Sequence, residues 1–276
     1  MGAGHKDRVF GSKPLGRIGT LEVRLACNAA EIAAAQEIRY RVFYEELGAN
    51  QSGLATAERD ADRFDDICDH LLVFDTALKG PTHRQIVGTY RLLRQERALA
   101  AGGFYSDEEF ELNTLIARHP AQRFLELGRS CVLPAYRSKR TIEVLWQGIW
   151  AYVNHYDIGV MAGCASFQGT VPAAHAEALS YLAHHCRTGS LWDVRAVAGR
   201  YCSMDLMPAE AISPKSAFLA MPPLVKAYLR IGGRVGDGCV IDADFGTVDV
   251  FIVLPVSDIG SRYISYYGSE SQSFAA

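Results

Sequence analysis

The distribution of apolar and polar residues predicts that strands and helices share this chain. Residues 21–26 (LEVRLA) alternate as in a half-buried strand. Asn28 and Glu31 then supply an N-cap and a capping-box partner for a helix that we expect to run to about residue 47 and to end at Gly48. Residues 49–60 read as a polar loop. The same reasoning predicts strands over 70–77, 85–94, 124–133, 159–167 and 248–256, and helices over 141–156, 174–186 and 222–230.

This order of elements is typical of one mixed α/β domain. We expect the domain to span residues 21–258 and to include a C-terminal extension, because the sequence shows no internal repeat and no low-complexity linker. Residues 1–20 and 259–276 are rich in Gly and Ser and are predicted to be tails. The run GGRVGDG (232–238) is predicted to be a turn. It lacks both the preceding strand and the G-x-G-x-x-G spacing of a dinucleotide-binding loop.

Composition limits the kinds of partner. The chain has 276 residues, of which 49% are hydrophobic, and its formal net charge is −3. Such a chain has no general attraction to nucleic acid or to an anionic membrane, so any recognition by charge must be local. Its seven cysteines are scattered and include no C-x-x-C pair, which argues against a disulfide framework and a structural zinc site. The same cysteine pattern favours a reducing cytoplasm as the compartment. We also expect a soluble or at most peripheral protein, since no apolar run approaches the roughly 20 residues that span a bilayer.

Several charged side chains occur where apolar neighbours predict burial. Charges are costly to bury unless they are paired. A convergent set of both signs is therefore either an internal ion-pair network or a polar substrate pocket, and the residues alone leave both alternatives open. The set comprises Arg39, Asp62, Asp65, Arg91, Glu126 and Arg129, with Phe43 one helical turn beyond Arg39.

Other motifs are weaker. His70 and Asp75 match an H-x4-D acyltransferase pattern, but the segment reads as a strand, where an offset of five places the two side chains on opposite faces. Cys131 lies in an apolar strand with no histidine nearby in sequence, which favours a buried structural cysteine over a nucleophile. His184 and His185 occur at a helix end, where cations are favoured without any metal.

The charged set also forms an ordered series of motifs. R-x-x-x-F at 39–43, D-x-F-D at 62–65, G-x-x-R-L-L at 88–93 and E-x-x-R at 126–129 follow one another along the chain. This series resembles the acyl-homoserine-lactone synthases, a branch of the GNAT-like acyltransferases that uses acyl carrier protein. Longer matches are closer to the ornithine-lipid N-acyltransferases, also called hemolysin-like. They are DRFDDICDHLLV (62–73), ELGRSCV (126–132), LWQGI (145–149) and PPLVKAYLR (222–230).

Two departures from the lactone synthases favour the ornithine branch. The loop after Gly48 has no tryptophan, and the chain continues well past the usual end of those enzymes. The resemblance implies a GNAT-like N-acyltransferase fold, with a central mixed, mostly antiparallel sheet flanked by helices. It also implies transfer of a (3-hydroxy)acyl chain from acyl carrier protein to the α-amine of L-ornithine, which gives lyso-ornithine lipid.

Other activities stay open at this point. One is a lactone-forming signal synthase with a sulfonium acceptor, and another is acylation of lysine or glutamine. A non-catalytic or cytolytic protein is a third alternative, although no strongly amphipathic lytic segment is present. For the enzyme we expect no metal and no cofactor, with acyl carrier protein as the co-substrate and partner. Peripheral contact with the inner membrane also stays open.

The resemblance assigns roles to the charged set. Glu126 is the expected general base, and Arg129 is expected to fix its position and to depress its pKa. Asp62 and Asp65 are expected to hold the side-chain ammonium of the acceptor. Arg39 or Arg91 is expected to bind its carboxylate in a bidentate manner. Phe43 completes the substrate-binding set.

A basic loop is expected to bind the donor. Residues 135–141 (AYRSKRT) lie between a predicted strand and a predicted helix, where GNAT-like proteins bind the pantetheine phosphate. The backbone N–H groups of a helix start suit an anion, as do basic side chains. A solvated basic loop without a ligand is the alternative. The expected donor-binding residues are Arg137, Lys139, Arg140 and Thr141.

Overall fold

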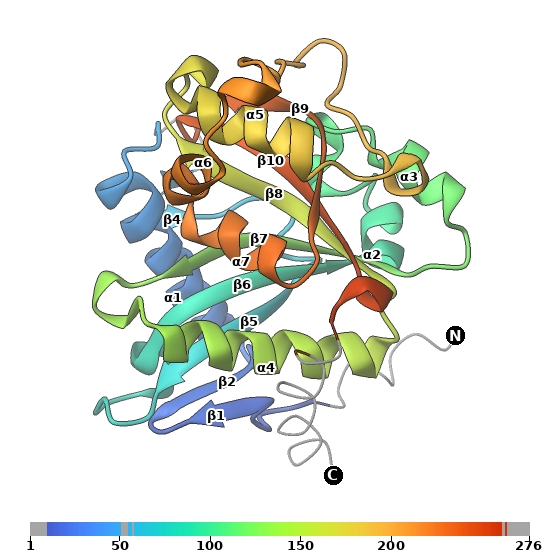
Figure 1. Cartoon of the computed structure of the whole chain (residues 1–276). Helices are drawn as coiled ribbons and strands as arrows, with labels where there is room; N and C mark the ends of the chain where they lie inside the picture. Colours follow the sequence, from blue (N-terminus) through green and yellow to red (C-terminus); the bar gives the residue numbers. More distant parts are fainter. Residues whose placement is uncertain (1–9, 51–54, 57, 261–262, 264–276) are drawn as a thin grey trace.

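Eight strands form a mixed sheet at the centre of the molecule (Figure 1). The computed structural model describes residues 10–50, 55–56, 58–260 and 263. The strand order is β1-β2-β5-β6-β7-β8-β10-β9, and neighbouring strands are antiparallel except for β7 and β8, which are parallel. The expected fold class is confirmed. The strands are β1 (Gly16–Ile18), β2 (Leu21–Leu25), β5 (Asp69–Asp75), β6 (Ile86–Arg94), β7 (Phe124–Val132), β8 (Val160–Gln168), β9 (Arg234–Asp242) and β10 (Thr247–Pro255), with β3 (Ala55–Thr56) and β4 (Arg59–Asp60) in a separate pair.

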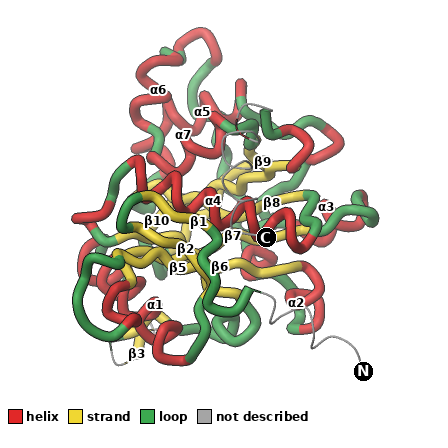
Figure 2. Tube along the Cα trace, turned by 90° about the horizontal axis from the view of Figure 1, so that it is seen from below, coloured by secondary structure: helices red, strands yellow, loops and turns green. Residues whose placement is uncertain are grey.

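Helices cover both faces of the sheet (Figures 1 and 2). Strand β5 shows the arrangement. Leu71 and Val73 pack into the apolar cluster beneath α4, whereas Leu72 and Phe74 pack against α1 on the other face. Because both faces are covered, β5 is apolar on both sides. The helices are α1 (Ala29–Tyr40), α2 (Gln95–Ala100), α3 (Leu112–Arg118), α4 (Lys139–Tyr156), α5 (Ala176–His185), α6 (Pro214–Ala220) and α7 (Pro223–Arg230).

The start of α1 is fixed by local chemistry. Asn28 accepts a hydrogen bond of 3.0 Å from the backbone N–H of Glu31, which confirms the predicted N-cap. The Glu31 carboxylate is itself buried and pairs with Arg24 at 2.6 Å. The helix continues as one π-helical turn (Arg41–Glu46) and ends before Gly48, whose φ of +74° closes it.

Strands β7 and β8 pair only briefly. Each strand has nine residues, but their parallel pairing covers three residue pairs and ends at Glu126 and Ala162. At Gly163 the two strands touch, because a Cβ atom there would lie 2.3 Å from the carbonyl oxygen of Leu127. Further along β7 a bulge interrupts its pairing with β6, and Arg129 in the bulge has a φ of +49°. On its other edge, which faces β8, β7 has no strand partner past Glu126 among the described residues.

Two expectations, about the N-terminal tail and one turn, need correction. The predicted tail over 1–20 is wrong for residues 16–18, which form β1 and pair with β2. Residues 1–9, and all but 259, 260 and 263 of the predicted C-terminal tail, lie outside the described residues. The turn predicted over 232–238 is wrong from Arg234 onward, where β9 begins. Its glycines and charge hid the strand, because pairing with β10 rather than local preference forms it.

No helix within the described part of the chain combines the length and the apolar character that a membrane span requires.

The contact at Gly163 gives a prediction about stability. Gly163→Ala would press a methyl group against the Leu127 carbonyl and would demand a φ of +157° from alanine. We expect the free energy of unfolding to fall by about 3 kcal/mol, measured by urea denaturation. Gly189→Ala is the control, because its added Cβ would have no atom within 4 Å. Equal stability of the two variants would show that β7 and β8 do not need this close contact.

Candidate active site

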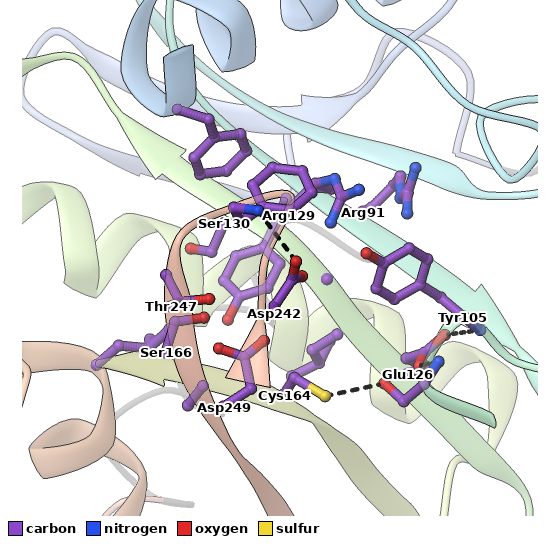
Figure 3. A pocket seen from close by; sticks show the side chains of 18 of the residues that line it. Arg91, Tyr105, Glu126, Arg129, Ser130, Cys164, Ser166, Asp242, Thr247 and Asp249 are labelled. Atoms are coloured by element: carbon purple, nitrogen blue, oxygen red, sulfur yellow. Dashed lines mark hydrogen bonds between the residues drawn. The ribbon is translucent and has the colours of Figure 1, made fainter. Parts of the chain in front are cut away.

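A cavity of about 250 Å³ opens where β7 and β8 separate (Figure 3). Its walls come from β6, β7, β8 and β10, from the segment that follows α2, and from the turn between β9 and β10. Apolar residues such as Leu47 and Leu224 share the lining with charged ones. This mixture suits a small substrate that carries charged groups on an apolar carbon chain. The charged lining residues are Arg91, Glu126, Arg129, Asp242 and Asp249.

Glu126 lies at the last residue pair that joins β7 to β8. Its side chain is buried, and its two carboxylate oxygens accept backbone N–H groups from Tyr105 at 3.0 Å and Ser106 at 2.9 Å. Burial raises the pKa of Glu126 above its usual range, although these hydrogen bonds oppose the shift. A carboxylate with a raised pKa is better matched to accept a proton from an amine.

The predicted relation between Arg129 and Glu126 is wrong. Backbone amides hold Glu126, and its pKa is raised rather than depressed. The Arg129 guanidinium lies between the rings of Tyr105 and Phe245, 4.6 Å and 4.3 Å from their centroids. Arg129 forms ion pairs with Asp60 of β4 at 3.4 Å and with Asp62 of the following loop at 3.5 Å. The bulge in β7 changes the direction of the side chain, and spacing along a regular strand does not anticipate this.

Arg39 belongs to a buried ion-pair network. It donates two hydrogen bonds of 2.8 Å to the carboxylate of Asp65, and its Nε lies 2.8 Å from Asp60. It also donates to the Asp60 carbonyl. The side chain is 1% exposed. Arg39 is therefore fully engaged within the protein, and it does not line the cavity.

Arg91 and Arg129 extend the network to the cavity wall. Arg91 lies 2.6 Å from Asp62 and 3.4 Å from Asp65, and Arg129 pairs with Asp60 and Asp62. Three arginines and three aspartates thus balance in charge. The internal network, one of the two alternatives open from the sequence, is present. The network contains every member of the charged set defined from the sequence except Glu126. Phe43, which was predicted with that set, lines the cavity.

The predicted roles of Asp62 and Asp65 as ligands of the acceptor stay predictions. Both carboxylates already have arginine partners, and neither is among the residues that line the cavity. The structure gives them a second role, because they join the loop at 61–68 to α1, β6 and β7.

Sequence reasoning missed a second acidic group, which consists of Asp249 in the cavity lining and Glu109 behind it. Glu109 pairs with Arg200 at 3.1 Å and accepts a hydrogen bond from the Cys164 thiol. Burial, together with the nearby charge of Asp249, raises the pKa of Glu109 to about 7, and burial raises that of Asp249 to about 6. The signal was present in the sequence, since Asp249 interrupts the apolar run VDVFIVLPV as Arg91 interrupts its own strand.

Glu109, Cys164 and Asp249 have ligand atoms within 4.8 Å of one another, so they could surround a cation. A metal ion prefers the thiolate form of cysteine. Burial raises the pKa of the Cys164 thiol well above its usual value and keeps it protonated. In this state the set offers two carboxyl groups and a neutral thiol, a combination that is able to surround an ammonium group.

Some side chains of the basic loop before α4 are engaged within the protein, and others are exposed. Ser138 caps the helix by accepting from the N–H of Thr141, whose own hydroxyl donates to the Tyr136 carbonyl. Arg137 forms a bidentate pair with Glu46, at 2.5 and 2.7 Å. Lys139 and Arg140 are exposed. The loop follows β7 directly, so it lies at the end of the strand whose edge is unpaired.

Comparison with known proteins places the chain in a family. Residues 38–147 match the model of the acetyltransferase (GNAT) domain. An L-ornithine N(alpha)-acyltransferase of Brucella abortus is 62% identical over 94% of this chain and 93% of that protein. The chain belongs to the L-ornithine N(alpha)-acyltransferase family. A second member, from Rhizobium meliloti, is 56% identical over 96% of this chain and 90% of its own length.

Membership of the L-ornithine N(alpha)-acyltransferase family confirms the resemblance drawn from the four motifs and makes the protein an acyltransferase. Among solved structures, the acyl-homoserine-lactone synthase LasI is similar with a TM-score of 0.48 and 14% identity, over 91% of this chain and 96% of LasI.

The network gives a prediction that separates a structural role for Asp65 from a role in acceptor binding. Asp65→Asn leaves the buried Arg39 with only one of its two charge partners, Asp60, so we expect the free energy of unfolding to fall by about 3 kcal/mol. Asp66→Asn, at the exposed neighbouring position, is the control and should leave stability unchanged. A stable Asn variant with a raised KM for the amine would instead support acceptor binding.

The same variant has a pH signature. Burial alone would raise the pKa of Asp65, but hydrogen bonds from Arg39 hold it below its usual value. The stability that the ionised Asp65 carboxylate contributes is therefore complete above its unfolded-state pKa of about 3.9 and is lost as the pH falls below that value. Wild-type stability should decline more than that of Asp65→Asn in this acid range.

Proposed function

We propose that this protein transfers a 3-hydroxyacyl chain from acyl carrier protein to the α-amine of L-ornithine and releases lyso-ornithine lipid. The observation that carries the proposal is a buried carboxylate with a raised pKa, Glu126, at the point where β7 and β8 separate and a cavity opens. The names of the family members supply the acceptor.

The chemistry needs a base and an aligned thioester. The α-ammonium of the acceptor gives a proton to Glu126, and the neutral nitrogen attacks the thioester carbonyl. The C–N bond forms as the C–S bond breaks, the nitrogen loses a second proton to become the amide, and the pantetheine sulfur leaves as a thiolate that takes up this proton. A thioester is already activated, so no acyl-enzyme is required. Cys131 is a poor nucleophile in any case, because burial raises its pKa to about 12.

The unpaired edge of β7 supports the place of the donor. Past Glu126, peptide groups on this edge have no strand partner among the described residues, so they are able to bond an extended pantetheine arm as an added strand would be bonded. Backbone N–H groups at the same edge would also stabilise the oxyanion. Lys139 and Arg140, at the capped start of α4, would then meet the phosphate and the acidic surface of acyl carrier protein.

The acceptor carboxylate needs a cation inside the cavity. Of the two arginines predicted for it, Arg91 lines the cavity and Arg39 does not. Arg129 also lines it, with its guanidinium held between two rings. We assign the carboxylate to this pair.

The product is a lipid, so the enzyme works in the cytoplasm with peripheral contact at the inner membrane, where the product enters the bilayer.

The role of Glu126 is tested by Glu126→Gln. Loss of a general base typically lowers kcat by about 10²- to 10⁴-fold. We expect this loss in the Gln variant while it still binds acyl carrier protein, with partial recovery at high pH, where more of the amine is unprotonated. Mass spectrometry of the product would distinguish an acyl-ornithine from a lactone. Glu111→Gln, at an exposed carboxylate, is the control.

The pH profile separates a base from a structural acid. Wild-type kcat should rise with pH through the ionisation of Glu126, at a pH above the usual carboxyl value, because burial raises its pKa. The pH profile of kcat for the Gln variant should lack this rise. A folded Gln variant with near wild-type kcat at neutral pH would remove Glu126 from the mechanism.

Donor binding is tested by reversing exposed charges. Lys139→Glu together with Arg140→Glu should raise KM for acyl carrier protein at least tenfold and leave KM for ornithine within about twofold, with an effect that shrinks at high salt. Arg118→Glu with Lys215→Glu makes the same change in net charge at exposed positions outside the loop and is the control. A change confined to KM for the amine would show that the loop serves the other substrate.

A further inference from the structure

Asp249 is a buried carboxylate that faces the cavity from β10 (Figure 3). It is 6% exposed, and its Oδ1 has no hydrogen-bond partner among the described residues. The hydroxyls of Ser166 and Thr247 lie beside it and favour its charged form. Burial raises its pKa to about 6, so the group is mostly ionised at neutral pH.

An ionised carboxylate in this position calls for a cation, because burial without a partner is costly. The other acids around the cavity already have partners. The aspartates of the ion-pair network have arginines, and Glu109 has Arg200. Asp242 accepts the backbone N–H groups of Asp244 and Phe245 at 2.8 and 3.0 Å. Among the described residues no lysine lines the cavity, and the two arginines that line it pair with the network.

Short contacts connect Asp249 with the predicted base. The N–H of Ser106 lies 2.9 Å from Glu126, and the Ser106 hydroxyl lies 3.3 Å from the Cys164 thiol. That thiol lies within 4.8 Å of an Asp249 carboxylate oxygen. Two carboxylates in one cavity, separated by a serine and a cysteine, match a molecule with two amino groups a few methylene groups apart.

We propose that Asp249 binds the side-chain ammonium of the acceptor and so selects a diamino acid over amino acids with neutral side chains. This inference rests on the proposed function and identifies the specificity determinant of the same site. Asp62 and Asp65 are less suited to the role, because neither of them lines the cavity. In the productive complex, the α-amine faces Glu126 and the distal ammonium faces Asp249.

The test compares two acceptors that differ only in the distal amine. L-Ornithine and L-norvaline share one carbon skeleton, and norvaline lacks the side-chain amine. In Asp249→Asn, kcat/KM for ornithine should fall roughly 100-fold, mainly through KM, while that for norvaline should change less than about threefold. Asp258→Asn, an exposed aspartate just past β10, is the matched control. Thermal unfolding should show both variants folded, and Asp249→Ser replaces Asn if that variant does not fold.

The outcomes separate this inference from the proposed function. Unchanged preference for ornithine in a folded Asp249 variant would overturn the subsite while the acyltransfer to ornithine stands. Calorimetry without donor gives an independent readout. If wild type binds ornithine and the Asn variant does not, the subsite stands even where turnover with ornithine fails. Wild-type activity that a chelator abolishes and a divalent cation restores, with no response in the Asn variant, would assign Asp249 to a metal and overturn the proposal.

Discussion

The separation of two parallel strands after three residue pairs shapes the whole site. Because β7 and β8 touch at Gly163 and then diverge, a cavity opens between them. The same divergence leaves one edge of β7 without a strand partner among the described residues, and it places Glu126 at the vertex. Base, donor edge and acceptor cavity are therefore consequences of one geometric constraint. Their relative positions cannot change without altering the sheet.

The buried ion-pair network gives this open region its stiffness. A neutral set of three arginines and three aspartates connects α1 and the loop at 61–68 to β6 and β7. Buried pairs of this kind add little net stability compared with apolar packing, but breaking one is costly, so they fix a single arrangement. Here the fixed arrangement holds Arg91 and Arg129 at the cavity wall with their charge already balanced. The cavity thus presents guanidinium groups without a strong net positive field.

Features that depend on neighbours in sequence could be predicted, and features that depend on distant pairing could not. The N-cap at Asn28, the strands β5 to β8 and the long helix α4 follow from local patterns, and the motif series located Glu126. The partner of Arg129 depends on a bulge, and β9 depends on pairing with β10. Asp249 interrupts an apolar run, which indicates a buried carboxylate, but its place in the cavity depends on distant pairing. Nothing local shows that β10 lies beside β8, about 80 residues earlier in the chain, and so faces the cavity.

The place of β10 between β8 and β9 has a consequence for how the enzyme is made. A ribosome releases β8 long before β10, and until then β8 presents an apolar edge with unsatisfied backbone groups. The sheet is completed only when β10 pairs with β8 and β9, a non-local step that is slow compared with helix formation. Catalytic competence therefore arrives only after β10 has been synthesised. A chain arrested before residue 247 would hold the base and the donor edge but would be prone to aggregate rather than to work at reduced rate.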